Sequence, residues 1–448
     1  ADDQYISNGL TEELLNALGR VKGIRVPSRT SVFAFQNSEA DIRSIGERLN
    51  VDHALEGSVR RSGNQVRIRA TLSDTRTGDQ LWSETYQQKM EDLFVLQESI
   101  ANTIVEHLSE RFLLQLRPAV SRPDAQAYNL YLRGRFFANK RNAAALTQAR
   151  EHFQEALRID ASYARSWAGL AESLALLGNY GVVPPSEAYP AAREAALKAL
   201  QLDPNLAEAH TTLALLYKDY FWDWDASKEH FEKAVQLDPN NATARHQYAV
   251  EYLSTMGHHA EAIREAEIAA ALDPLSVVVS ADLGRVYYSA RQPEKAIVQL
   301  KKTLELEPTF FMAHLYMGIA YLMENENGLA LERFRDAQVY SGDSLGPNPN
   351  SVAYTAVALS TAGRTKEARE TLQQLHQLGT RRYVAPYWFG LVNGKLGEWD
   401  EAFSWMDSAL VDRNLHLLYL KDSPLTNTFR DDPRTAAILA KMGLTIDS

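Results

Sequence analysis

The chain has 448 residues, of which 45% are hydrophobic and 23% charged, with a formal net charge of −10 and no cysteine. At about 150 residues per domain, this length allows roughly three domains or one long repeat array, and the composition argues against wholesale disorder. The lack of cysteine excludes disulfides, thiolate zinc sites, iron–sulfur clusters and cysteine nucleophiles, and the negative charge argues against a nucleic-acid binder, which needs a basic face.

The first 116 residues mix helical and strand patterns. Apolar residues such as Val66, Ile68 and Leu72 alternate with Arg67 and Arg69, which is typical of a half-buried strand. In chain order we expect first a helix through Leu10 and Leu18, which Gly19 and Gly23 end, then a short strand over 24–26 and a helix over 42–49. Strands over 51–61, 66–72 and 81–86 follow, and a long helix over 90–114 comes last. This order predicts a small α+β domain.

Four ordered segments of this part carry a family resemblance. They are Ser7–Leu18, Ile24–Ser31, Leu55–Arg61 and Leu81–Glu84, and together they resemble the TolB-amino-terminal-like (FlgO-like) domain. That domain occurs in bacterial CadC-like regulators with a winged-helix DNA-binding domain, and in class III adenylate cyclases with tetratricopeptide (TPR) tails. The family usually begins with a further apolar strand, which this chain lacks before Tyr5. We therefore expect the sequence to be a fragment that lacks the first strand, or another element to replace that strand.

A polar stretch, Arg117–Asp124, follows the predicted long helix. It contains Pro118 and Pro123, which fix φ and disfavour helix in the residue before each proline. We therefore place the first domain at 1–116, a linker at 117–124, a repeat array at 125–413, and a capping helix and tail at 414–448.

A recurring three-residue motif indicates the repeat array. Leu-Asp-Pro begins at Leu202, Leu237 and Leu272, and Leu-Glu-Pro begins at Leu306, at intervals of 35, 35 and 34 residues. A period near 34 residues that ends in proline is the TPR period. About eight repeats fit between Tyr128 and the end of the array, with an insertion at 178–190 and a loop at 341–350. The predicted fold is an α+β domain followed by an all-α TPR superhelix (α-solenoid) with a concave groove.

Four motifs suggest chemistry, and each also has a structural interpretation. Gly342–Leu345 spells the GDSL-hydrolase signature, but a TPR helix and a proline loop flank it and no Asp-x-x-His motif follows, so we interpret it as a loop. We interpret His258-His259 as a solvated turn, with a metal site as the alternative. We interpret the aromatic stretch Phe221–Asp225 as a cover over the end of a helix pair, with a ligand-stacking site as the alternative. We interpret the arginines at 60, 61, 67 and 69 as a solvated face of the hairpin, with anion binding as the alternative. We expect no catalytic residue, metal or cofactor.

The groove of the array is the predicted binding site. The inward-facing positions of the TPR register are Arg165, Glu172, Lys218, His246, Arg285, Tyr288, Met312, Leu315, Ile319, Leu322 and Tyr387. The lysine and asparagine clamp that other TPR domains use for carboxyl termini is not assembled there. An extended or helical peptide with apolar anchors fits better. As the alternative, the apolar positions from Met312 to Leu322 pack against the next helix pair.

These observations predict a non-enzymatic sensor and interaction module of a bacterial membrane-tethered regulator. By resemblance, an output domain would precede this segment across the membrane, which places the segment in the periplasm. We expect a protein or peptide ligand, no nucleic acid bound by this segment, and no membrane insertion, because Asp273 and Pro274 interrupt the most apolar stretch. Oligomerisation stays open. The alternatives are a scaffold or assembly factor in the cytoplasm without an output domain, and an enzyme, such as a hydrolase, with its site in the TolB-like domain or in the loop Gly342–Asn350, which contains Ser344.

Overall fold

The computed structural model describes residues 4–21, 23–36, 38–109, 122–180, 182–342 and 346–446. The chain forms two compact units, which we describe separately. Unit 1 comprises Ala1–Arg245 and Leu272–Pro274, and unit 2 comprises His246–Ala271 and Leu275–Ser448. Three features predicted from the sequence fall at least partly outside the described residues: the GDSL motif at 343–345, most of the linker at 117–121, and the end of the long helix beyond residue 109.

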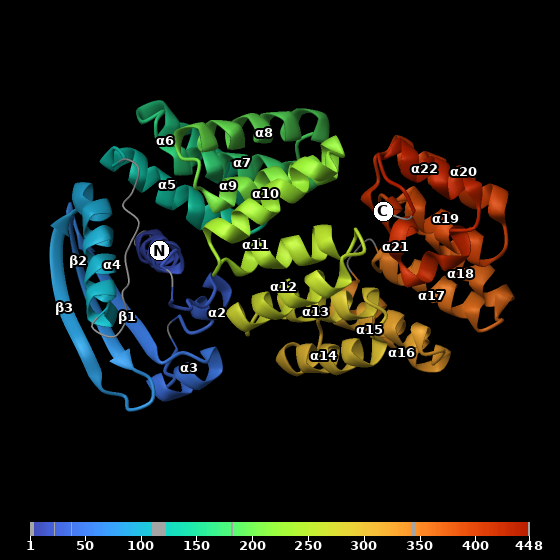
Figure 1. Ribbon diagram of the computed structural model, residues 1–448, viewed down its shortest axis with the longest axis horizontal. Coiled ribbons are helices and arrows are strands. Elements are labelled where there is room, and N and C mark those ends of the chain that lie inside the picture. Colours follow the sequence, from blue (N-terminus) through green and yellow to red (C-terminus); the bar gives the residue numbers. More distant parts are fainter. Residues whose placement is uncertain are drawn as a thin grey trace. The chain divides into compact units, whose positions relative to one another are not determined.

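Unit 1 begins with an α+β region built around a three-stranded antiparallel sheet of order β1-β2-β3 (Figure 1). Val66 and Ile68 of the central strand are buried while Arg67 is exposed, so the predicted alternation is confirmed. Helices α1 and α4 pack against the strands. The elements are α1 (Gln4–Gly19), α2 (Arg29–Phe33), α3 (Ile42–Leu49), β1 (His53–Ser62), β2 (Gln65–Asp74), β3 (Gln80–Lys89), the 3₁₀ turn η1 (Met90–Asp92) and α4 (Leu93–Ser109).

The short strand predicted over residues 24–26 is wrong, because these residues join no sheet. Tertiary contacts hold these residues instead: a side chain from a distant segment satisfies the carbonyl of Ile24, and the Arg25 side chain bonds to the backbone at the end of α3. The Asn240 amide donates to the carbonyl oxygen of Ile24 at 3.0 Å, and the Arg25 guanidinium donates to the carbonyl oxygen of Leu49 at 2.8 Å. A carbonyl that is already paired does not need a strand partner, so local β propensity loses to tertiary contacts here.

The rest of unit 1 consists of antiparallel helix pairs of the TPR type. The pairs are α5 (Ala125–Ala138) with α6 (Ala143–Ile159), α7 (Ala164–Asn179) with α8 (Pro185–Leu202), and α9 (Ala207–Leu216) with α10 (Trp224–Leu237). Helix α8 has 18 residues where α10 has 14, so the predicted insertion is largely absorbed as about one extra helical turn. Helices α8 and α10 end at the leucine of the recurring triplet, as the period predicts.

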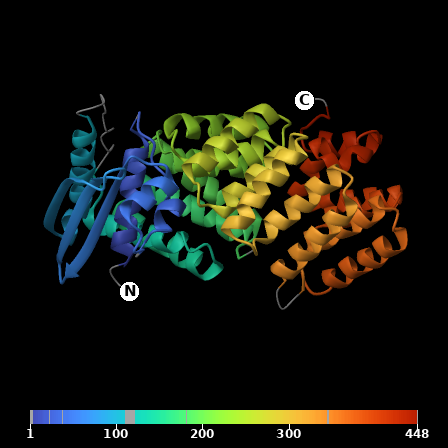
Figure 2. The same ribbon diagram turned by 90° about the horizontal axis from the view of Figure 1, so that it is seen from below.

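Unit 2 contains four further helix pairs, and within it the pairs follow one another along the chain (Figure 2). They are α13 (Val277–Ser289) with α14 (Pro293–Leu306), α15 (Phe311–Met323) with α16 (Asn327–Ser341), α17 (Pro349–Thr361) with α18 (Thr365–Gly379), and α19 (Pro386–Lys395) with α20 (Trp399–Val411). Small residues allow close approach inside a pair. A Cβ atom on Gly318 would lie 2.4 Å from Cε1 of Phe334. The TPR-like helical array is therefore present in both units.

The stretch at the position of the remaining repeat crosses the division between the units. It contains α11 (Ala242–Gln247), η3 (Tyr248–Leu253) and α12 (His259–Leu272). Element η3 and the earlier η2 (Tyr217–Phe221) are π-helical turns, which the sequence did not indicate. The aromatic box Phe221–Asp225 lies between η2 and α10, where Trp222 adopts a left-handed conformation with φ of 55°. It thus sits at the end of a helix pair, as we expected.

Beyond the last pair, unit 2 ends in a series of short helices. These are η4 (Leu415–Leu418), α21 (Tyr419–Asp422), η5 (Pro424–Phe429) and α22 (Pro433–Lys441). Helix α22 matches the predicted capping helix and packs against α20. The three elements before it were not predicted. Phe429 is fully buried and contacts the rings of Trp399 and Phe403. Hereafter we call Leu415–Phe429 the C-terminal segment.

Across the described ranges, no helix is both long enough and apolar enough to span a bilayer.

Candidate functional site

In unit 1, the predicted groove residues Arg165 and Glu172 make ion pairs within the chain. Arg165 of α7 pairs with Glu13 of α1, and Glu172 accepts hydrogen bonds from Arg135 at 2.8 Å and Arg141 at 3.0 Å. Burial alone would raise the pKa of Glu172, but the charges of Arg135 and Arg141 lower it. Glu172 is therefore ionised at neutral pH, and its carboxylate is already paired within the chain.

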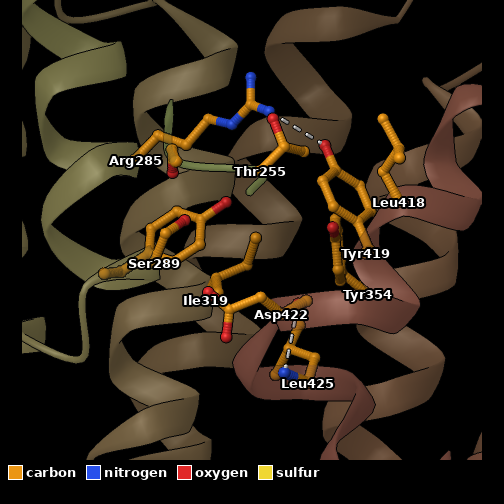
Figure 3. Close-up of a pocket in the computed structure, with 12 residues that line it drawn as sticks. Thr255, Arg285, Ser289, Ile319, Tyr354, Leu418, Tyr419, Asp422 and Leu425 are labelled. Carbon is orange, nitrogen blue, oxygen red and sulfur yellow. Dashed lines mark hydrogen bonds between the residues drawn. The ribbon is translucent and has the colours of Figure 1, made fainter. Parts of the chain in front are cut away.

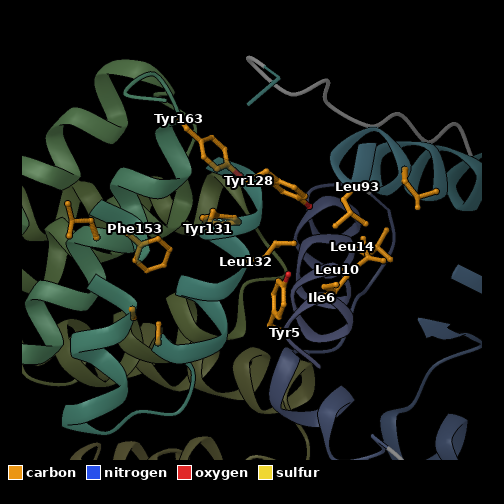
Figure 4. Packing of buried hydrophobic residues seen from close by; sticks show 14 of the residues in the cluster. Tyr5, Ile6, Leu10, Leu14, Leu93, Tyr128, Tyr131, Leu132, Phe153 and Tyr163 are labelled. Carbon is orange, nitrogen blue, oxygen red and sulfur yellow. The ribbon is translucent and has the colours of Figure 1, made fainter. Parts of the chain in front are cut away.

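Helix α1 packs against the first helix of the array, α5 (Figure 4). Leu10 and Leu14 belong to one buried apolar cluster with Tyr128 and Leu132 of α5, and Figure 4 shows both α5 side chains directed toward α1. The carboxylate of Glu12, also on α1, accepts from the amide of Asn139 and pairs with Arg135 and Arg29. An internal helix thus fills the first part of the predicted groove.

Other predicted groove residues are also engaged or buried. Lys218 lies in η2 with its ammonium 2.5 Å from the Asp219 carboxylate, and in unit 2 the imidazole of His246 lies 2.8 Å from the carboxylate of Asp282. Leu315, Ile319 and Leu322 of α15 are 2%, 1% and 6% exposed, and Met312 is half-buried. These apolar positions are core, as the packing alternative holds, so they leave little surface for apolar anchors.

Unit 2 contains a small cavity of about 30 Å³ that brings Arg285, Tyr288 and Ile319 together (Figure 3). We call it the Arg285 cavity. Its lining comes from the residues after η3, from α13, α15 and α17, and from the C-terminal segment. The lining residues are Ser254, Thr255, Arg285, Tyr288, Ser289, Ile319, Tyr354, Leu418, Tyr419, Asp422, Ser423 and Leu425.

The Arg285 guanidinium lies next to the hydroxyls of Tyr288 and Tyr419 and has no close carboxylate among the described residues. It donates to the hydroxyl of Tyr419 at 3.4 Å, as Figure 3 shows, and the one carboxylate within 4 Å among the described residues belongs to Glu251, at 3.9 Å. Burial raises the pKa of Tyr288, and also that of Tyr354, so both hydroxyls stay protonated at neutral pH. The cavity therefore holds the Arg285 guanidinium among neutral hydroxyl groups, and the one carboxylate of its lining, on Asp422, is paired with His259, Arg291 and Arg430 instead. A guanidinium in this setting suits an added carboxylate.

A second charged centre lies at the same face, on Asp422 of the C-terminal segment. Its carboxylate lies 2.6 Å from the imidazole of His259, 3.2 Å from the guanidinium of Arg291 and 3.3 Å from that of Arg430. Burial alone would raise the pKa of Asp422, but the hydrogen bond from His259 and the charges of His259, Arg291 and Arg430 lower it. Asp422 is therefore ionised at neutral pH and paired on three sides.

Interpreting both histidines as a solvated turn is wrong for one of them. His258 is exposed, but His259 is partly buried against Asp422, which is 163 positions away in the sequence. No local sequence pattern predicts a contact between two residues so far apart along the chain. Within the described ranges, no three histidine, aspartate or glutamate side chains gather closely enough to hold a metal ion.

The last predicted groove residue, Tyr387, contacts the C-terminal segment directly. Its ring lies 5.9 Å from that of Tyr419 and 5.7 Å from that of His416, measured between centroids. Arg285, Tyr288, Ile319 and Tyr387 thus lie near the C-terminal segment within unit 2. The sequence did not indicate that residues of the same chain would lie against these positions.

Comparison with known proteins gives one partial sequence match. No protein-family model matches the sequence. The protein described as "Putative adenylate cyclase 3" of Rhizobium meliloti (strain 1021) is 33% identical over 219 residues, covering 47% of this chain and 37% of that protein. The chain therefore aligns with little more than a third of the length of this relative.

Solved structures of repeat proteins show a distant likeness. PilW, a type IV pilus biogenesis factor, has a TM-score of 0.40 at 20% identity, covering 47% of this chain and 92% of PilW. A TPR protein from Parabacteroides merdae has a TM-score of 0.44 at 12% identity, covering 61% and 99%. Yeast Tom70 has a TM-score of 0.44 at 16% identity, covering 76% and 74%.

Proposed function

We propose that this chain is a non-enzymatic protein-interaction module, and that unit 2 binds an acidic peptide segment at the Arg285 cavity. The observation that carries the proposal is the guanidinium of Arg285, which lies in a cavity with a hydroxyl at 3.4 Å and no carboxylate closer than 3.9 Å among the described residues. A guanidinium held away from water is stabilised when a carboxylate binds it at hydrogen-bond distance.

The size of the cavity limits the ligand. A cavity of about 30 Å³ holds roughly two water molecules or the end of one carboxylate side chain. The buried state of Leu315 and Leu322 argues against deep apolar anchors on α15. A peptide that contributes one carboxylate and otherwise lies on the surface fits these limits.

We further propose that the module is the sensor part of a bacterial membrane-tethered signalling protein. Its output domain, a winged helix or a nucleotide cyclase, would precede this chain, and the module would lie on the periplasmic side of the inner membrane. Two observations support this proposal: the ordered TolB-amino-terminal-like segments between Ser7 and Glu84, and the 33% identity with a protein whose name refers to adenylate cyclase.

The test of the interaction proposal is a selection of random peptides from a phage-displayed library on the full chain. We expect peptides with Asp or Glu to be enriched, and their affinity to fall about tenfold or more in Arg285→Ala, because a hydrogen-bonded charge pair is lost. Arg335→Ala is the matched control, since Arg335 is an exposed arginine of α16 outside the cavity. Equal binding of the selected peptides to wild type and Arg285→Ala would contradict the proposal.

A further inference from the structure

The outer edge of strand β3 in unit 1 has backbone groups without backbone partners. The sheet order β1-β2-β3 makes β3 an edge strand. The Met90 N–H donates to the carbonyl of Asn64 at 3.0 Å, and hydrogen-bonded pairs alternate along an antiparallel ladder, so even-numbered residues of β3 turn their backbone groups toward β2. Ser83, Thr85 and Gln87 therefore direct their N–H and C=O groups away from the sheet. Within the described ranges, no backbone hydrogen bond reaches these groups from outside the sheet.

This edge lacks the features that protect edge strands from pairing with another chain. Natural edges are usually blocked by short strands, proline, bulges or a lysine within the strand. Strand β3 has ten residues without proline or glycine, its single lysine is its last residue, and the irregularity in its pairing with β2 lies at its first residues. Strand β1, the other edge, is interrupted by Gly57 and carries two consecutive arginines. The middle of β3 is therefore the better template for an added strand.

One face of the same sheet carries arginines without ion pairs. The register places Arg60 of β1 directly opposite Arg67 of β2, and Arg69 lies on the same face two residues further along. Lys89 of β3 adds a fourth cation to this face. All four are exposed, and none forms an ion pair with a described residue, not even with Glu56 on the same face. Like charges opposite each other destabilise a strand pair, so a carboxylate nearby would be stabilising.

A strand added to the edge of β3 would bring its side chains within reach of these arginines. Arg69 is opposite Thr85 in the register, and Arg67 is opposite Gln87. An added strand lies about 5 Å beyond β3 and about 10 Å from β2, and its side chains opposite Thr85 and Gln87 share the face of the arginines. Arg69 needs to reach only across the small side chain of Thr85 to meet a glutamate at that place.

The other face of the added strand would lie beside aromatic side chains. Trp82 and Tyr86 are opposite the buried residues Leu72 and Ile68, and each is half-buried. Apolar side chains of an added strand would cover them further. Glu84 lies between them and accepts the hydroxyl of Tyr86 at 2.9 Å, so a polar residue suits the position opposite Glu84.

We infer that the edge of β3 binds an extended acidic segment of a partner protein as a fourth, antiparallel strand. Its residues alternate between carboxylates toward Arg67 and Arg69 and apolar side chains toward Trp82 and Tyr86. A second copy of this chain fits the edge less well, because its β3 would bring another set of arginines to this face instead of carboxylates. The inference concerns unit 1 and does not depend on the peptide proposed for unit 2.

The test of the charges uses the full chain and the fluorescein-labelled peptide Glu-Val-Glu-Thr-Glu-Val-Glu, titrated by fluorescence anisotropy. We expect the double variant Arg67→Gln, Arg69→Gln to bind the peptide about tenfold more weakly than wild type, because two exposed charge pairs are lost. Added salt should weaken binding to wild type. Arg158→Gln is the matched control, since Arg158 is an exposed arginine of α6, and it should bind as wild type does.

The test of backbone pairing changes the peptide and leaves the protein intact. In an antiparallel fourth strand, the amides of the two inner glutamates point toward β3 and those of the two valines point away. N-methylation of these glutamates should weaken binding about tenfold or more, whereas N-methylation of the valines should leave it within about twofold. The unmodified peptide should also slow amide hydrogen exchange in β3 and leave exchange in β1 unchanged.

The outcomes keep this inference apart from the proposed function. No binding of the peptide, or equal binding of the two methylated peptides, would overturn the inference. Binding that is lost in Arg285→Ala would place the peptide on unit 2 and overturn it as well. A chain that sediments as a dimer and is unaffected by the peptide would show that a second copy occupies the edge instead. In each of these cases, library peptides that need Arg285 would leave the proposed function standing.

Discussion

At the residue scale, Asp238 is a buried acid that works against the stability of unit 1 at neutral pH. It is the aspartate of the Leu-Asp-Pro triplet that begins at Leu237, at the turn after α10, and is 8% exposed. We call such a turn a repeat corner. Burial raises its pKa to about 6, and the charge of Arg20 and the hydrogen bond from the backbone N–H of Asn240, at 3.3 Å, only partly offset this. The folded state therefore binds the proton more tightly than the unfolded state does, so its stabilising effect is present below about pH 4 and is lost as the pH rises through 6.

Replacing Asp238 with Asn should stabilise unit 1 at neutral pH. The amide keeps the shape and an acceptor oxygen but cannot ionise, so we expect a gain of up to about 3 kcal/mol in unfolding free energy at pH 7, and little change near pH 3.5. Thermal unfolding from pH 3.5 to 7.5 measures this. Asp203→Asn is the matched control, because Asp203 has the same corner position but is only half-buried. A gain at pH 7 no larger than that of Asp203→Asn would contradict the explanation.

The charged contacts show how far individual residues could be predicted. The TPR register predicts Arg285, Tyr288 and Tyr387 as groove positions, because the repeat period fixes which helix positions share a side, and the three residues lie near Tyr419. It did not indicate that Glu13 would pair with Arg165, 152 positions away, or His259 with Asp422. Such pairs leave no periodic trace in the sequence, since each partner alone resembles an ordinary surface charge.

At the scale of elements, the close contact inside each helix pair depends on small residues. In α15, Gly318 faces the ring of Phe334 in α16, and both are buried. Gly318→Ala would place a Cβ atom 2.4 Å from that ring, so we expect a loss of about 1–3 kcal/mol in the stability of unit 2 from overpacking. Chemical denaturation followed by circular dichroism measures the loss.

Gly328→Ala provides the matched control for this substitution. Gly328 lies in α16, and a Cβ atom there would meet nothing within 4 Å. Because alanine favours helix over glycine, we expect Gly328→Ala to be neutral or to stabilise by up to about 1 kcal/mol. A similar loss in both variants would show that the glycine in α15 does not act through its contact with Phe334.

Elements with strong periodicity were predicted well, and short elements were not. The strand β2 and the helix α3 follow from alternation and from a helical apolar stripe. The predicted strand at 24–26 and the unpredicted short helices at 415–429 show the opposite case. Segments of a few residues take their conformation from the surface on which they pack, and that surface is assembled from distant parts of the chain.

At the scale of the whole molecule, the chain divides into two compact units inside the repeat array, between Arg245 and His246. In repeat arrays, stability arises within repeats and between neighbouring repeats, so a division between units weakens cooperativity. We expect two unfolding transitions in calorimetry. Asp238→Asn should raise only one of them at pH 7, and Gly318→Ala should lower only the other.

Hydrogen exchange assigns each transition to its unit. Faster exchange in α15 and α16 of Gly318→Ala, with unchanged exchange in β1–β3, would match the expected independence. A single transition that moves with both substitutions would show that the two units unfold together. The repeat period predicted the helical array of both units, but the division is not periodic and no sequence pattern marked it.

The attachment of the first domain to the repeat corners has a consequence for how this protein can evolve. The Asn240 amide holds the carbonyl of Gly19, the amide of Ser28 donates to the carbonyl of Leu272, and the hydroxyl of Ser31 donates to Asp273. These contacts tie one domain to two successive corners, 35 residues apart. Gain or loss of a whole repeat between those corners would break the attachment, whereas repeats added after Pro274 would not. We therefore expect repeat number among descendants of this protein to vary downstream of that corner and to stay constant between the two.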